Sequence, residues 1–214
     1  LGALLAWCFS YVLPSWERRS VPDAIGRALR ELSDYAAHSL RAGSGDAVDE
    51  RLARRKAYES LAALGAALSR SRVEPRGVRL PIERVAALLD HGERFMAHLS
   101  LVRHSLARLD DAAELRRVDA ALADAVAALG ACLDIAAADD VAERRTAAAV
   151  AAAADDVDLL PAQPPTADVV PWLARRLAQL VREATDIRAA AQASLATAGE
   201  AARNTLVAAR RNAP

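Results

Sequence analysis

The sequence predicts an all-α fold: a bundle of about five to six long amphipathic helices that follows the end of a transmembrane helix. Three observations lead to this prediction. Alanine dominates the composition, and aromatic residues make up only 4% of the 214 residues, which is typical of helical proteins. Apolar residues recur at steps of three and four, whereas no stretch alternates with the period of two that a half-buried strand needs. An uncharged apolar run, residues 1–13, opens the chain.

Residues 1–13 are predicted to be the cytoplasmic end of a transmembrane helix that continues upstream. As a helix they would span about 20 Å, whereas a hydrocarbon core is about 30 Å thick. Aromatic side chains near the exit, followed by an arginine pair, fit the cytoplasmic interface of a membrane. The residues predicted to lie at this interface are Trp7, Tyr11, Trp16, Arg18 and Arg19. The alternative is a short buried helix of a soluble domain.

The membrane segment is predicted to occupy residues 1–17, a cytoplasmic helical domain residues 18–199 and a frayed tail residues 200–214. The first helix of the domain is expected to start at the capping box Ser20–Asp23, with a proline in its first turn. The glycines at 43 and 45 should end it. The residues expected on its buried face are Val21, Ile25, Ala28, Leu29, Leu32, Ala36 and Leu40.

Two further helices are predicted on either side of the breaker at residues 74–77. One starts at Asp46 or Asp49 and runs to about Arg72. The other starts at Pro81 and runs to a turn near Asp110. The residues expected in the core are Leu61, Leu64, Gly65 and Leu68 from the first, and Ile82, Val85, Leu89, Met96, Leu99 and Leu106 from the second.

The distal half is predicted to hold a heptad-patterned helix after Asp111, a short alanine-rich helix after Asp140 and a long final helix after Asp168. Prolines make residues 155–165 a loop, and Gly199 weakens the final helix. The predicted core positions are Leu115, Val118, Leu122, Ala125, Leu129, Cys132 and Ala136, and then Leu173, Leu177, Leu180, Ala184, Ile187, Ala191 and Leu195.

The charge pattern favours a membrane surface over a nucleic acid. The net charge is zero, but the proximal half of the chain is basic and the distal half acidic, which suits a domain standing on an anionic leaflet. The sequence has no basic stripe interleaved with aromatic residues, so no nucleic-acid partner is predicted. Cys8 and Cys132 lie far apart and are interpreted as small core residues in a reducing compartment.

The sequence contains no recognisable catalytic or cofactor motif, so we predict no catalytic residue, no cofactor and no enzyme. It has no GxSxG and no glycine-rich phosphate loop. His91 and His98 lie seven residues apart and His104 falls on another face, whereas zinc ligands on one helix are expected four apart, as in HExxH. No metal site is therefore predicted. An enzyme with an unrecognised site is the weakest of the alternatives.

Two clusters of basic residues stand out. The first is expected either to contact lipid headgroups or an anionic solute, or to be a solvated face paired with Asp49, Glu50 and Glu59. The second is interpreted as a structural aromatic anchor with an exposed basic face. The clusters are Arg51, Arg54, Arg55 and Lys56, and Trp172 with Arg175, Arg176 and Arg182.

Three segments together resemble one part of a known family. They read SYVLPSWERRSVPDAIGRAL, RLARRKAYESLAALGAALSRSRVEPR and HGERFMAHLSLVRHSL. They are similar to the region just after the last transmembrane helix of the fusaric acid resistance family, most closely its YccS-like inner-membrane members. The matching positions are Tyr11, Pro14, Trp16, Glu17, Arg51, Ala53, Arg54, Arg55, Ala62, Ala63, Leu64, Glu74 and Pro75. The resemblance covers about residues 1–108, and Glu50 departs from it, standing where the family has tyrosine.

The resemblance implies an inner-membrane protein that exports aromatic carboxylic acids such as fusaric or hydroxybenzoic acid. Its implied partners are its own upstream transmembrane domain, the lipid bilayer and further copies in a homo-oligomer. We expect this domain to act in assembly or gating, with Arg18, Arg19, Arg51, Arg54 and Arg55 nearest the membrane. The family-motif residues expected to contact an anion or lipid are Pro14, Glu17, Arg51, Arg54, Arg55, Glu74 and Pro75. The alternative is a structural or adaptor bundle that binds another protein.

Overall fold

The computed structural model describes residues 16–41, 47–74, 79–109, 112–136, 139 and 169–211, with the backbone alone for residues 16–19, 112, 114 and 198–211. Within these ranges the fold is all-helical and has no strand, so the predicted helical bundle is confirmed. The helices are α2 (Trp16–Ser39), α3 (Ala47–Ser71), α4 (Ile82–Leu106), α5 (Ala112–Leu133) and α7 (Val169–Arg211).

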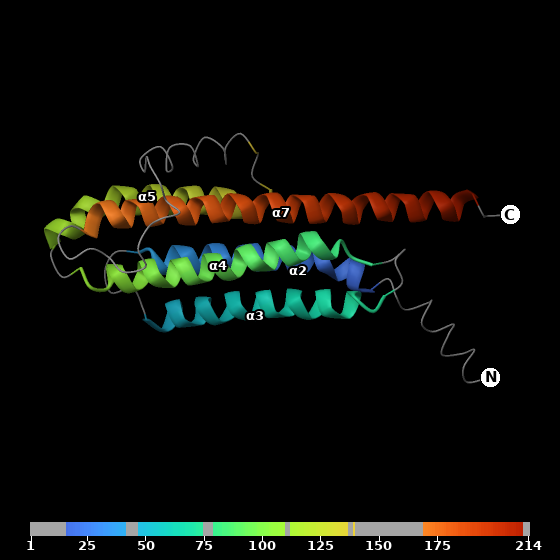
Figure 1. The fold of residues 1–214 in the computed structure, drawn as a ribbon, viewed down its shortest axis with the longest axis horizontal. Helices are drawn as coiled ribbons and strands as arrows, with labels where there is room; N and C mark the ends of the chain where they lie inside the picture. Colours follow the sequence, from blue (N-terminus) through green and yellow to red (C-terminus); the bar gives the residue numbers. More distant parts are fainter. Residues whose placement is uncertain are drawn as a thin grey trace.

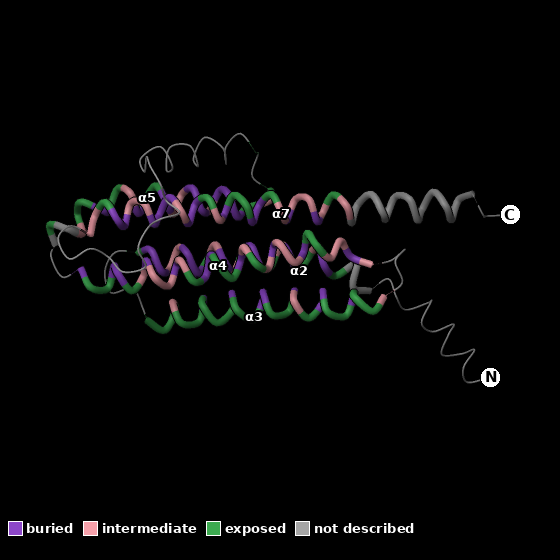
Figure 2. Tube along the Cα trace, in the orientation of Figure 1, coloured by how far each residue is buried: buried purple, intermediate pink, exposed green. Residues whose placement is uncertain are grey.

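The first four helices run alternately up and down, whereas α7 runs parallel to α5 (Figure 1). Helix α2 packs on all the others, and α7 packs on both α4 and α5. Among the described helices α3 touches only α2 and α4, so it lies at one side of the bundle. Its outward face is exposed along its whole length (Figure 2).

The core follows the predicted helix faces closely. Every residue predicted on the buried face of α2 is at most 2% exposed. Helix α4 buries more than predicted, adding Leu88, Phe95 and Val102, because α7 covers one side of it and α2 and α3 cover the other. By contrast Ala136, predicted as core, is exposed because α5 ends at Leu133.

The start of α2 differs from the prediction. The helix begins at Trp16 and not at Ser20, so Pro22 lies inside it. Proline removes one backbone hydrogen bond and crowds the preceding turn, but Val21 and Ile25 beside it are buried, and their packing offsets that cost. Helix α2 thereby crosses the boundary predicted at residue 17. At the other end of the chain α7 continues through Gly199 to Arg211.

Several predictions fall outside the described residues. They include the membrane segment before Trp16, the alanine-rich helix after Asp140 and the loop at residues 155–165. No helix in the described ranges combines the length and the apolar character needed to cross a bilayer.

Candidate functional site

The structure does not bring the predicted basic residues together in one rim. Arg18 and Arg19 lie in the first turn of α2, whereas Arg51, Arg54 and Arg55 lie near the start of α3. Because α2 and α3 are antiparallel neighbours, these positions lie at opposite ends of the pair (Figure 1). A helix of the length of α2 spans about 36 Å. Of the remaining predicted residues, Trp7, Tyr11, Pro14 and Pro75 lie outside the described ranges.

The three arginines near the start of α3 are exposed and are held by contacts within their own helix. Arg51 Nε donates to the Ala47 carbonyl at 2.9 Å, and the Arg54 guanidinium lies 5.7 Å from the centre of the Tyr58 ring. Arg55 Nε bonds the Glu59 carboxylate at 2.6 Å, which raises the pKa of Arg55. Exposed pairs of this kind contribute little to stability, because solvent screens the two charges. The arginines therefore lie on the surface without joining α3 to the core.

Apolar side chains lie beside these arginines. Val48, one turn before Arg51, and Leu52, directly after it, are 59% and 48% exposed. Glu50, which was a predicted partner of the cluster, instead pairs with Arg103 of α4 at 3.0 Å. We call the surface formed by Val48, Arg51, Leu52, Arg54 and Arg55 the α3 face. It combines positive charge with exposed apolar area.

Glu74 has a structural role in the turn between α3 and α4. Ser71 Oγ donates to the Glu74 carboxylate at 2.7 Å and accepts from the Leu80 amide at 2.9 Å. The Arg79 guanidinium donates to the Glu74 carbonyl at 2.9 Å. These bonds hold the chain as it leaves α3 and give a structural reason for this acidic residue, whereas its contact with an anion or lipid stays a prediction.

The prediction of an exposed basic face beside Trp172 is wrong in part. Trp172 is buried, and Arg176, one turn along α7, is only 6% exposed. The Arg176 guanidinium lies 5.3 Å from the Trp172 ring centre and donates to the Gln179 side-chain oxygen at 2.7 Å. Burial lowers the pKa of Arg176. The predicted aromatic anchor is therefore present, but Arg176 is buried against it and does not form an exposed basic face. Arg182 is exposed, as predicted.

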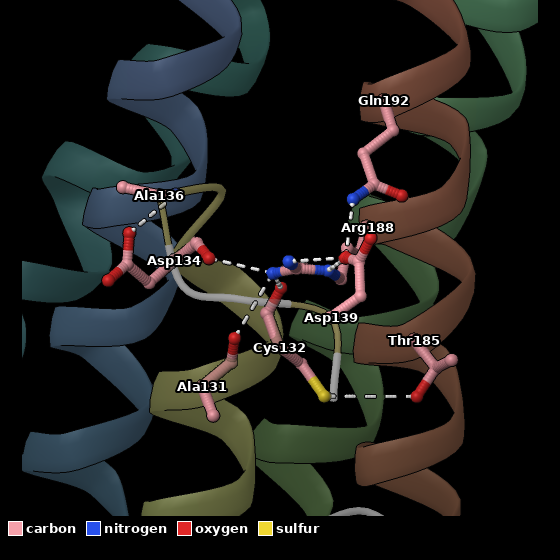
Figure 3. Close-up of polar contacts among 8 residues, drawn as sticks. All are labelled: Ala131, Cys132, Asp134, Ala136, Asp139, Thr185, Arg188 and Gln192. Atoms are coloured by element: carbon pink, nitrogen blue, oxygen red, sulfur yellow. Dashed lines mark hydrogen bonds and ion pairs between the residues drawn. The ribbon is translucent and has the colours of Figure 1, made fainter. Parts of the chain in front are cut away.

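Arg188 of α7 is a second buried cation, which joins α7 to the end of α5 (Figure 3). Its Nη1 donates to the carbonyl oxygens of Ala131, Cys132 and Asp134 at 3.2, 3.3 and 2.7 Å. Its Nη2 bonds the Asp139 carboxylate at 2.8 Å, which lowers the pKa of Asp139. A cation that binds the last carbonyls of a helix satisfies them and complements the helix dipole. Arg188 therefore caps α5.

A polar cluster lies between α4 and α7. His91 Nδ1 of α4 is 3.2 Å from Glu183 Oε2 and 3.9 Å from Asp186 Oδ2 of α7. Arg94 joins the cluster, with its Nη2 2.9 Å from His91 Nδ1 and its Nη1 3.1 Å from an Asp90 oxygen. Spacing within one helix could not reveal this cluster, because its members come from two helices far apart in the sequence.

A groove of about 440 Å³ lies along α2 and α3. Its lining alternates acidic and basic residues, including Asp23, Arg27, Glu31, Lys56 and Glu59, and contains neither histidine nor cysteine. Such a seam of mixed charge is typical of two helices whose contact line is solvated. A second groove of about 430 Å³, between the end of α2 and α5, is lined mostly by apolar atoms.

Comparison with known proteins yields one distant relative. No protein-family model and no solved structure matches the chain. The chain is 30% identical over 104 residues to a protein of Haemophilus influenzae that is described as uncharacterized. The match covers 47% of this chain but only 14% of that protein, so the chain spans about one seventh of the length of this relative.

Proposed function

We propose that this chain is the cytoplasmic helical region of an inner-membrane exporter of the fusaric acid resistance type, acting in assembly or gating and not in catalysis. The observation that carries the proposal is the residue pattern itself. An apolar, aromatic-rich opening leads into Pro14-Ser15-Trp16-Glu17, and the arginine-rich start of α3 follows. The match to a small part of a much longer Haemophilus influenzae protein supports a region within a larger protein. The exported class would be aromatic carboxylic acids.

The exposure of the motif arginines supports a role in contacts between polypeptides. Ala53 and Leu64 are 7% and 0% exposed and serve the packing of α3. The arginines among them stay on the α3 face, beside exposed apolar side chains. This face lies at the end of α3 far from Trp16, where the membrane segment would enter. A mixed apolar and basic surface there suits a second protomer better than lipid headgroups, since interfaces favour arginine beside apolar area.

The test is the triple substitution R51Q/R54Q/R55Q in the full-length protein. We expect a smaller oligomer and lower export of an aromatic acid, because glutamine keeps a polar side chain but removes the positive charge. A matched control is R108Q/R116Q/R182Q, since these three arginines are also exposed but lie off α3. The readouts are oligomer mass by light scattering in detergent and efflux of the acid from cells. Unchanged mass and efflux in the α3 variant would contradict the proposal.

The alternative is an adaptor bundle that binds another protein and takes no part in transport. The exposed Leu52 and Tyr58 of α3 favour it, because apolar side chains on an outer helix suit a protein partner. The two proposals differ in one readout. The experiment replaces the exposed apolar residues Val48, Leu52 and Tyr58 of α3 with polar residues. If the chain is an adaptor, efflux of the aromatic acid should stay unchanged, whereas the transporter proposal expects efflux to fall.

A further inference from the structure

We propose that His91, Glu183 and Asp186 form a binding site for a divalent transition-metal cation, with Zn²⁺ as its representative, and that the cation clamps α4 to α7. The site is independent of the α3 face and goes beyond assembly or gating. Among the described residues, these side chains form a group of histidine and carboxylate ligands close enough to share one ion.

The distances suit a tetrahedral ion. The ligand atoms of the three residues all lie within 4.8 Å of one another, and His91 Nδ1 is 3.2 Å from Glu183 and 3.9 Å from Asp186. Zinc bonds to nitrogen and oxygen are roughly 2.0–2.2 Å long, which places tetrahedral ligand atoms about 3.3–3.6 Å apart. Glu183 and Asp186 are one turn apart on α7 and reach the same histidine. Small side-chain movements would therefore complete the three-ligand arrangement.

The hydrogen-bonding of His91 is inconsistent without a cation. If Nδ1 carries a proton, it donates to Glu183 at 3.2 Å but then faces an Arg94 nitrogen, also a donor, at 2.9 Å. If Nδ1 is unprotonated, it accepts from Arg94 but then faces the Glu183 oxygen, also an acceptor. Either state leaves one unfavourable contact. A metal ion at this point accepts the lone pairs of all three ligand atoms.

The local charge also favours an added cation. Arg94 bonds Asp90 at 3.1 Å and lies 3.6 Å from Glu183, and Asp186 lies 3.9 Å from His91. Three carboxylates against one arginine leave a negative excess while His91 is neutral. Arg94 retains Asp90 as a partner when a metal ion takes its place beside His91. The arginine therefore competes with the ion for the site but does not exclude it.

The ligand set selects the class of metal. One imidazole with two carboxylates suits Zn²⁺ and similar first-row ions, whereas Mg²⁺ and Ca²⁺ prefer sites made of oxygen alone. The Asp186 side chain is 58% exposed, so the fourth position of a tetrahedral ion would face solvent. Because one ligand comes from α4 and two from α7, bound Zn²⁺ should stabilise the contact between these helices.

The test is calorimetric titration of the EDTA-stripped protein with ZnCl₂, with MgCl₂ as a parallel arm. We expect one Zn²⁺ per chain, a rise in the unfolding midpoint with Zn²⁺ and no effect of Mg²⁺. Loss of a residue that only hydrogen-bonds to a metal ligand lowers metal affinity by roughly 10- to 100-fold. H91A and E183Q each remove a ligand itself, so each should lower the affinity for Zn²⁺ by more than this. H104A, at an exposed histidine of the same helix, should bind as the parent does. Circular dichroism in EDTA checks that each variant is folded.

The substitution R94A separates a metal site from a plain ion-pair cluster. It removes the competing cation, so Zn²⁺ affinity should rise, whereas a cluster that serves only to pair charges would gain no affinity for metal. The proposal is overturned if the parent binds no Zn²⁺. It is equally overturned if H91A and E183Q bind Zn²⁺ as tightly as the parent, because the ion would then lie elsewhere.

Discussion

Arg188 satisfies three carbonyl oxygens at the end of α5, and its side chain is only 7% exposed. Replacing it with alanine leaves these oxygens in a buried site without a donor. We expect R188A to lower the free energy of unfolding by about 3 kcal/mol, and R188K by less, because lysine keeps the charge but not the planar fork. Urea denaturation measures both. R182A, at an exposed arginine of the same helix, should change stability by less than about 0.5 kcal/mol.

His98 gives the stability of the bundle a defined dependence on pH. Its Nδ1 is buried and has no hydrogen-bond partner in the described part of the chain. Burial lowers its pKa, Glu183 acts to raise it, and Arg176 and Arg94 act to lower it. The unfolded chain, with a histidine pKa of about 6.5, then binds the proton more readily than the folded one. Protonation of His98 therefore costs no stability well above about pH 6.5. The free energy of unfolding falls as the pH drops from there toward the lower pKa of His98 in the folded state.

The measurement is urea denaturation in EDTA between pH 7.5 and 5, in the parent and in H98N. Asparagine has a polar side chain but no proton to gain in this range, so the variant should lose less stability on acidification than the parent. H104N is the matched control, since His104 is exposed on the same helix. Equal losses in H98N and the parent would mean that burial of His98 does not set the pH dependence.

Two glycines show how closely the helices approach one another. A Cβ at Gly92 of α4 would lie 2.9 Å from Leu61 Cδ2 of α3, whereas one at Gly130 of α5 meets no atom within 4 Å. Alanine in a helix interior is favoured over glycine by roughly 0.5–1 kcal/mol. We expect G130A to raise the free energy of unfolding by about that amount. G92A should lower the free energy of unfolding by about 1 kcal/mol, because the buried Leu61 side chain leaves no room for the added methyl group. Thermal unfolding of both variants and of G92A/L61A measures this; equal gains in the two single variants would refute it.

At the level of single helices the sequence was a good guide. The periodic apolar residues of α2 and α7 are buried as predicted, except that Leu195 is only partly buried, because the period of a helix fixes which side chains share a face. The start of α2 was misjudged, since Pro22 is compatible with a helix N-terminus and with the interior of a well-packed helix alike. The end of α5 was placed too late, because the arginine that caps it is on another helix.

Pairings between distant helices could not be predicted from local patterns. His91 meets Glu183, and Arg188 meets the end of α5, only because α7 packs beside both α4 and α5. The periodicity of α5 and of α7 does not specify that the two helices run parallel to each other (Figure 1). The candidate metal site was therefore invisible in the sequence, whereas the exposed arginines of α3 could be identified from composition and spacing.

For the molecule as a whole, the position of α2 determines whether the bundle unfolds as one unit. Among the described helices α3 packs only on α2 and α4, and α5 does not touch it, so α2 is the helix that contacts both α3 and α5 (Figure 1). Leu32 of α2 is 1% exposed. We expect L32A to lower the free energy of unfolding by roughly 2–5 kcal/mol and to speed amide hydrogen exchange in α3 and α5 alike.

Hydrogen exchange followed by mass spectrometry measures the two helices separately, and L52A, at a half-exposed position of α3, is the matched control. If the core is a single cooperative unit, the protected amides of α3 and α5 exchange through the same global opening. Loss of packing at Leu32 should then speed amide exchange in both helices. Faster exchange in α3 with unchanged α5 would instead mean that the α2–α3 pair opens separately from the α5–α7 pair. In that case α3 would be able to move relative to α7 without unfolding of the whole bundle.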